Sequence, residues 1–296
     1  ESDKRCYFFT TKILDGEDLQ IEDTRYGLGF NKMDLSESKV LEIYNRMVEF
    51  SPKWMIVQPS ILLLFINVLK AHSLPSLPEL KYIELTGERI TGEAKSSIAD
   101  FFRCKVADQY GCYEANSIAY ECPYGGLHVM TDNVYVETAG ENEDDICITS
   151  LHNRVMPFIR YKIGDRGKII HNHNCQCGSQ EPIIELNMAR ENDWIYNKDG
   201  TKCHSDLFCD VIDKINLALQ QAVIQFQIIQ KDYHEFDVYL VIDEEEETDM
   251  IQQLFLENYE KYQEKSRFHF FFVDCLYPSE KTGKLAWFIS NVEEIL

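Results

Sequence analysis

Apolar residues in the first third of the chain follow two alternating patterns. Stretches in which they recur every three or four positions predict amphipathic helices, and short segments between these helices predict strands. The helices are expected at residues 38–50, 59–72 and 92–102, and the strands at residues 54–57, 81–85 and 105–109. Helices and strands that alternate at this spacing favour a parallel sheet of the α/β kind.

Two polar motifs directly follow strands of this predicted sheet. Thr86-Gly87-Glu88 follows the strand at 81–85, and a Tyr-Gly-Cys-Tyr-Glu motif at 110–114 follows the strand at 105–109. Ligands of open parallel sheets bind at the carboxyl ends of the strands, where both motifs are expected. The glycine of the second motif indicates a tight turn, after which we expect a helix.

The rest of the chain shows two further patterns. Period-two alternation predicts a β-rich subdomain with strands at residues 134–137, 146–150, 158–161 and 168–171. Beyond it, the pattern predicts helices at 205–219 and 248–265 and strands at 223–229, 236–242 and 268–275. The expected fold is α/β, with a large domain at 1–190 (parallel sheet plus β-rich subdomain) and a small C-terminal α+β domain at 191–296. Polar residues interrupt the apolar pattern at Asn192 and Asp193, where we place the boundary.

Composition narrows the classes of partner. The chain has 296 residues and a formal net charge of −21, which argues against nucleic acid and against an anionic membrane surface. The longest apolar run, residues 61–66, is far shorter than the roughly 20 residues that cross a membrane, and no signal peptide is evident at the start. We therefore expect a soluble, cytoplasmic protein.

Cysteine spacing suggests a metal site. Cys175 and Cys177 are too close in sequence for an ordinary disulfide, and with Cys122 and His128 they supply the ligand types of a closed zinc site. His171 and His173 are alternatives to His128, and a set of reduced, buried cysteines without metal is the alternative to zinc. Three thiolates and one imidazole leave no open coordination position, so the expected role of the metal is structural.

Three acidic or basic side chains suggest ATP chemistry, and each also has an ordinary interpretation. Glu114 suits Mg²⁺ on phosphate oxygens, or is an exposed acid at a turn. Asp165 follows a glycine and suits the hydroxyls of a ribose, or belongs to a plain turn. Lys284 stands on a loop from which it can reach a phosphate, although Tyr277 and Leu285 exclude a complete phosphate-binding P-loop.

The order of the motifs resembles the adenylate-forming superfamily. Tyr-Gly-x-x-Glu at 110–114 is followed by Arg-Tyr-x-x-Gly-Asp at 160–165, by Ala189-Arg190 where Gly-Arg is usual, and by Thr-Gly-Lys at 282–284. Thr86-Gly87-Glu88 and the cysteine motifs resemble the phenylacetate–CoA ligase and coenzyme F390 synthetase-like branch. The similarity extends from about Gly27 to Lys284.

This resemblance implies ATP-dependent activation of a small carboxylic acid as an acyl-adenylate. Lys284 would then approach the α-phosphate, Glu114 would bind Mg²⁺, Asp165 the ribose, and Arg190 the nucleotide near a hinge at 192–193. The adenine would lie against residues of two motifs, namely Thr86, Gly87, Glu88, Gln109, Tyr110 and Gly111. The small domain would rotate to admit a thiol acceptor, most simply coenzyme A.

The resemblance also leaves alternatives open. Nothing before Gly27 matches the family's Gly/Ser/Thr-rich phosphate loop, so the chain is a fragment, or another polypeptide supplies the loop, or ATP chemistry is lost. Cys112 and Tyr113 replace a small hydroxyl pair. The competing functions are AMP transfer or acyl transfer to an amine or carrier protein without coenzyme A, and a non-catalytic, zinc-stabilised partner module. A carrier protein or a second copy of the chain is a candidate partner.

Overall fold

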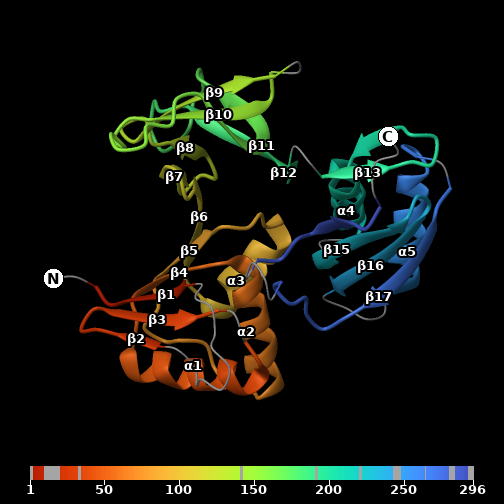
Figure 1. The fold of residues 1–296 in the computed structure, drawn as a ribbon. Coiled ribbons are helices and arrows are strands. Elements are labelled where there is room, and N and C mark those ends of the chain that lie inside the picture. Colours follow the sequence, from red (N-terminus) through yellow and green to blue (C-terminus); the bar gives the residue numbers. More distant parts are fainter. Residues whose placement is uncertain are drawn as a thin grey trace. The chain divides into compact units, whose positions relative to one another are not determined.

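The computed structural model describes residues 3–9, 21–32, 35–140, 143–190, 193–219, 222–242, 248–263, 265–279 and 284–292. The chain divides into two compact units, and Figure 1 labels their helices and strands. The first comprises Glu1–Gln109 and Cys275–Leu285, and the second Tyr110–Asp274 and Ala286–Leu296. Among the described residues, no helix is long and apolar enough to cross a membrane.

The first unit is built on a mostly parallel sheet in the order β2-β3-β1-β4-β5-β6. Only the edge strand β2 is antiparallel to its neighbour. The strands are β1 (Arg5–Phe9), β2 (Ile21–Asp23), β3 (Gly27–Asn31), β4 (Trp54–Val57), β5 (Tyr82–Thr86) and β6 (Lys105–Cys112). The sequence pattern predicted β4, β5 and β6 but gave no sign of the three N-terminal strands.

Three helices connect the parallel strands of this unit. Helix α1 (Glu37–Phe50) buries residues spaced three and four apart, which is the amphipathic pattern that predicted it. Helix α2 (Pro59–Ala71) is apolar on nearly every side and correspondingly buried, and it begins with proline at its first turn. Helix α3 (Gly92–Phe102) is capped by Thr91, whose hydroxyl accepts the Ala94 N–H at 3.2 Å.

The second unit begins with an antiparallel sheet in the order β7-β8-β12-β11-β10-β9. Its strands are β7 (Asn116–Glu121), β8 (Leu127–Val129), β9 (Val134–Ala139), β10 (Asp145–Ser150), β11 (Tyr161–Ile170) and β12 (Ile183–Arg190). Alternate residues form its core, among them Ile118, Val134, Ile146 and Ile184. This is the β-rich subdomain that the period-two pattern predicted.

Two predictions for this region are wrong. No helix follows the motif at 110–114, because a turn at residues 113–115 leads directly into β7. Residues 158–160 are not in a strand: β11 begins at Tyr161 and continues to Ile170, so one long strand replaces two predicted short ones. Gly164 lies inside β11 with a φ of +80°, and the pairing register shifts next to it, which hides the strand's continuity from a simple alternation test.

The remainder of the second unit is the small α+β domain predicted for the C-terminal part. Its sheet has the order β17-β16-β15-β18, and a separate ribbon pairs β13 with β14. The elements are β13 (Trp194–Tyr196), β14 (Lys202–His204), α4 (Asp206–Ala218), β15 (Val223–Asp232), β16 (Glu235–Ile242), α5 (Thr248–Tyr259), β17 (Arg267–Phe272) and β18 (Phe288–Ser290). Helix α5 and strand β17 both end earlier than predicted. The proposed domain boundary at 190/191 stays a prediction.

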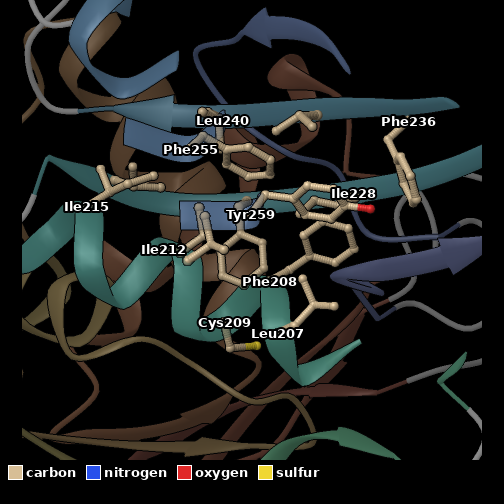
Figure 2. Packing of buried hydrophobic residues seen from close by; sticks show 14 of the residues in the cluster. Leu207, Phe208, Cys209, Ile212, Ile215, Ile228, Phe236, Leu240, Phe255 and Tyr259 are labelled. Atoms are coloured by element: carbon tan, nitrogen blue, oxygen red, sulfur yellow. The ribbon is translucent and has the colours of Figure 1, made fainter. Parts of the chain in front are cut away.

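An aromatic cluster centred on Phe208 forms the core of this small domain (Figure 2). Its ring is fully buried and lies 5.5 Å from Phe236, 5.7 Å from Tyr259, 5.9 Å from Phe288 and 6.1 Å from Phe255, measured between ring centroids. These partners come from three strands or helices that are distant in sequence. One side chain therefore joins both helices to the sheet.

We expect Phe208→Ala to lower the free energy of unfolding by about 3–5 kcal/mol, because it removes a fully buried ring and leaves a cavity. Urea denaturation followed by tryptophan fluorescence measures this, since Trp287 packs on Phe226 in the same core. Phe271→Ala is the matched control: that ring is 41% exposed and stacks on Tyr239 outside the cluster, so a loss of at most about 1 kcal/mol is expected. Equal losses for the two variants would contradict the assignment of the core.

Candidate functional site

The carboxyl end of β5 and the part of β6 that pairs with it form the predicted edge of the sheet in the first unit. Thr86 and Gln109 are neighbours across the two parallel strands. The Thr86 hydroxyl donates a hydrogen bond to the Gln109 side-chain oxygen, which fixes the orientation of that amide. Two of the side chains predicted to line an adenine are thus held together by a direct contact.

Gly87 turns the chain directly after β5 with a φ of +80°, a backbone conformation that residues with a Cβ rarely adopt. A Cβ atom at this position would lie 3.6 Å from Gln58 Nε2 and 3.8 Å from Lys284 Cε, which are ordinary contact distances. The glycine is therefore required by the turn rather than by lack of space. The same distances place the stem of Lys284 beside this turn, and the role of its ammonium stays a prediction.

The Glu88 carboxylate is occupied by donors of the protein itself. It accepts the Ser60 N–H at 3.0 Å, the Ser60 hydroxyl at 2.9 Å and the Leu285 N–H at 2.8 Å. Burial raises the pKa of Glu88, and these hydrogen bonds and the nearby Lys32 act in the opposite direction. The adenine contact predicted for this residue stays a prediction, and the carboxylate already serves the fold.

Lys32 is a buried cation that the sequence analysis missed. Its side chain is only 6% exposed, and burial lowers its pKa to about 8, with the charge of Lys284 acting in the same direction and that of Glu88 against it. The residue follows β3, a strand that was itself not predicted, so no pattern marked it. It brings a second lysine into the neighbourhood of Glu88.

In the second unit, the structure brings Tyr110 and Asp165 together. The Tyr110 hydroxyl donates to Asp165 Oδ2 at 2.9 Å, joining the motif at 110–114 to the one at 160–165. Tyr110 and Gly111 lie within β6 rather than after it, which corrects their predicted place. The predicted adenine and ribose residues of this unit are therefore neighbours.

Glu114 is held by a residue that the motif analysis did not single out. The Tyr161 hydroxyl donates to Glu114 Oε1 at 2.8 Å, and this bond is the main cause that lowers the pKa of Glu114. The Cys112 thiol is hydrogen-bonded to the same carboxylate. Burial raises the pKa of this thiol. Tyr113 is 96% exposed, so its bulk does not fill the space around Glu114.

The remaining predicted site residues are placed only in part. Arg190 is paired with Asp165 in the backbone register of β11 and β12, and the structure does not describe its side chain. Asn192 and residues 280–283, which include the threonine and glycine before Lys284, lie outside the described residues.

Four side chains of the second unit form the predicted metal cluster. The ligand atoms of Cys122, His128, Cys175 and Cys177 all lie within 4.8 Å of one another. The Sγ atoms of Cys122 and Cys175 are 3.6 Å apart, and Cys177 Sγ is 3.2 Å from His128 Nε2. A tetrahedral zinc ion with bonds of about 2.3 Å to sulfur and about 2.0 Å to nitrogen spaces its ligands by roughly 3.5–3.8 Å. The donor types suit zinc, and the four atoms are near enough together to share one ion.

Hydrogen bonds around the cluster orient the ligands. His128 Nδ1 bonds to the carbonyl oxygen of Glu181 at 3.0 Å, which leaves Nε2 directed at the sulfur atoms. The alternative ligand His173 bonds the same carbonyl through Nε2 at 2.8 Å and accepts the Cys175 N–H on Nδ1 at 3.3 Å, so both its nitrogens are engaged. Among the described residues, His128 is the histidine of the cluster.

Two tight turns present the cysteines. Gly125 and Gly178 have φ values of +82° and donate their N–H groups to the carbonyl oxygens of Cys122 and Cys175, both at 3.0 Å. Burial acts to raise the pKa of the Cys122 thiol, but hydrogen bonds from the Tyr124 N–H, the Cys175 thiol and the Gly126 N–H outweigh it and lower the pKa to about 7. Thiolate is the form that binds metal.

Comparison with known proteins identifies the fold. A 2-hydroxyisobutyryl-CoA ligase in the postadenylation state, in complex with R3-HIB-AMP, superposes with a TM-score of 0.73 at 13% identity, over 98% of this chain and 66% of that one. The chain has the fold of the adenylate-forming ligases. A benzoate CoA ligase from Burkholderia xenovorans LB400 matches with a TM-score of 0.54 at 16% identity, over 87% of this chain and 54% of that one. The predicted fold class is confirmed.

Comparison by sequence finds relatives that are named CapK rather than CoA ligase. A family model described as the CapK C-terminal domain matches residues 195–291. Protein CapK of Staphylococcus aureus is 25% identical over 214 residues, which is 70% of this chain and 45% of that protein. The chain thus spans less than half the length of this curated relative and about two thirds of the 2-hydroxyisobutyryl-CoA ligase.

The contact between Tyr161 and Glu114 gives a prediction that needs no substrate. We expect Tyr161→Phe to raise the pKa of Glu114 towards its ordinary value, because the hydrogen bond that favours the ionised carboxylate is lost. NMR titration of the Glu114 carboxyl carbon measures the shift, and Tyr135→Phe, at an exposed tyrosine of β9, is the control. An unchanged Glu114 pKa in Tyr161→Phe would contradict the contact.

Proposed function

We propose that this chain is the part of an adenylate-forming ligase that activates a small carboxylic acid with ATP and passes the acyl group to coenzyme A. The observation that carries the proposal is the pairing of motif residues that are far apart in sequence. Tyr110 contacts Asp165 at 2.9 Å, and Glu114 contacts Tyr161 at 2.8 Å. Similarity to several CoA ligases in fold adds support.

Each residue has a role that follows from its chemistry. Asp165 accepts hydrogen bonds from the ribose hydroxyls, and Arg190 contacts the nucleotide. Glu114, ionised through its bond with Tyr161, is the group that would hold Mg²⁺, and that ion would neutralise phosphate charge. The adenine lies against the backbone of 86–88 and against residues 109–111.

In the proposed reaction an oxygen of the substrate carboxylate attacks the α-phosphorus of ATP. The new phosphorus–oxygen bond forms as the bond to pyrophosphate breaks, so the products are acyl-adenylate and pyrophosphate. Lys284 presents its ammonium to the oxygens on which charge develops, which stabilises the transition state electrostatically. The thiol of coenzyme A then attacks the acyl carbon and releases AMP.

We expect ATP–pyrophosphate exchange in the presence of a panel of aryl and aliphatic acids. The assay is run on this chain and on the longest natural reading frame that contains it, because nothing before Gly27 matches the phosphate loop that the resemblance implies. Lys284→Ala should reduce exchange by about 10²-fold or more, the scale of losing one charge-stabilising group. Lys70→Ala, at an exposed lysine of α2, should leave it unchanged.

The possible outcomes separate the alternatives. Exchange without formation of a CoA thioester would favour transfer to another acceptor, such as an amine, a hydroxyl or a carrier protein. An absence of exchange in both proteins, together with an absence of ATP binding by calorimetry, would leave the non-catalytic partner module as the better description.

We further propose that Cys122, His128, Cys175 and Cys177 hold a structural zinc ion. The support is the spacing of the four ligand atoms and the bond between His128 Nδ1 and the Glu181 carbonyl. Such a site ties the turn after β7 to the turn before β12, and in doing so stabilises the antiparallel sheet.

We expect one zinc ion per chain by elemental analysis of protein prepared under reducing conditions. Cys177→Ser should reduce the zinc content to near zero and lower the thermal midpoint, and a strong chelator should have the same effect on the unmodified chain. Cys104→Ser is the matched control, since Cys104 lies in the first unit and outside the cluster. Zinc content that is unaffected by Cys177→Ser would refute the ligand set.

A further inference from the structure

The peptide that joins Lys284 to Leu285 is held from two sides. Its carbonyl oxygen accepts the Ser279 N–H at 2.9 Å, and its N–H donates to Glu88 Oε1 at 2.8 Å. Two hydrogen bonds in opposite directions fix the plane of a peptide unit, and with it the direction in which the preceding side chain leaves the backbone. All of these atoms belong to the first unit.

From this fixed peptide, the Lys284 side chain extends towards the turn after β5. Its Cε atom lies 3.8 Å from the position that a Cβ atom would take on Gly87. Glu88, which holds the peptide, is the residue directly after Gly87, so one short turn contacts both the backbone and the side chain of the lysine segment. The bond to Leu285 spans 197 positions of sequence, so it cannot be a local feature of either loop.

The charges around Glu88 explain why its carboxylate stays in this place. Ser60 offers its N–H at the start of helix α2, where the aligned peptide dipoles favour a negative charge. Lys32 is buried nearby, and its charge interacts with those of both Glu88 and Lys284. The negative charge of Glu88 thus offsets, at Lys32, the repulsion from Lys284.

We propose that Glu88 is a positioning residue whose carboxylate latches the Lys284–Leu285 peptide and thereby sets where the Lys284 ammonium is presented. This inference rests on the proposed function of Lys284 in acid activation. It assigns to Glu88 a role distinct from contact with the adenine. Lys32 supports the latch by placing a buried positive charge close to the carboxylate.

A positioning role for Glu88 predicts an effect on activity that a purely structural role does not. Lys284 is proposed to act in the step that forms the acyl-adenylate, and not in the attack of the thiol on that intermediate. Loss of the latch should therefore slow the first step alone. A general loss of folded protein would instead lower both steps by the same factor.

The experiment uses the longest natural reading frame that contains this chain, with the variants Glu88→Ala and Glu88→Gln. We expect Glu88→Ala to reduce ATP–pyrophosphate exchange by about 10- to 100-fold, the scale of misplacing a reactive group by about an ångström. Thioester formation from supplied acyl-adenylate should stay within about twofold of the unmodified protein, a margin well below that of a lost catalytic contact. Glu88→Gln keeps an acceptor oxygen and should lose less, which also provides a test if the alanine variant does not fold.

A second measurement reports the latch without any activity. In the unmodified 296-residue chain, the Leu285 amide hydrogen should exchange slowly with solvent, which NMR measures. Glu88→Ala should accelerate that exchange by about tenfold or more, because the amide loses its acceptor. Glu42→Gln, at an exposed acid of α1, should leave it unchanged.

The outcomes are distinguishable. If Lys284→Ala abolishes exchange of pyrophosphate while Glu88→Ala does not reduce it, the latch is wrong and the proposed function stands. If Glu88→Ala lowers both steps alike, or leaves the Leu285 amide as protected as before, the latch is also overturned. If the unmodified protein shows no exchange with any acid, the proposed function fails and the positioning role fails with it.

Discussion

The extended backbone of strand β6 is the constraint that sets the directions of two candidate residues, Gln109 and Tyr110. Its first residues pair with β5 inside the first unit, where Gln109 receives the hydroxyl of Thr86. The next residue, Tyr110, belongs to the second unit and donates to Asp165. Consecutive residues of one extended strand point to opposite faces, so a single strand supplies polar groups to two different networks.

The lysine side chains near the candidate site are important because the chain as a whole is strongly acidic. A net charge of −21 opposes the approach of the proposed nucleotide, whose phosphates would have to be met by groups at the site itself. Lys284 and the buried Lys32 supply positive charge around one carboxylate in the first unit. In the second unit, tyrosine hydroxyls contact the carboxylates Glu114 and Asp165. The contact with Tyr161 lowers the pKa of Glu114 without adding charge.

The sequence was informative wherever side-chain periodicity matched burial. Helices α1 and α3 and strands β4 and β5 were placed to within a residue or two, since each has an apolar face that repeats with the period of its own structure. The cysteine cluster was also predicted as a set, because the ligand types of a closed zinc site are few and sequence can reveal them. Strand β11 was not recognised as one element, since Gly164 interrupts its alternation with a left-handed residue.

The periodicity of the sequence could not predict which side chains contact one another. Nothing in the motif at 110–114 indicates that Tyr161 would hold Glu114, because that contact depends on how the turn after β6 meets β11. The hydrogen-bond donors of Glu88 were likewise not predicted from the sequence. Motif order favoured an adenine contact for it, whereas a half-buried carboxylate must first find donors, and an acid that lacks them pays a desolvation penalty of several kcal/mol. Its donors are Ser60 and Leu285, which precede and follow it by very different distances in sequence. A carboxylate satisfied in this way is better suited to hold a lysine segment in place than to bind a ligand.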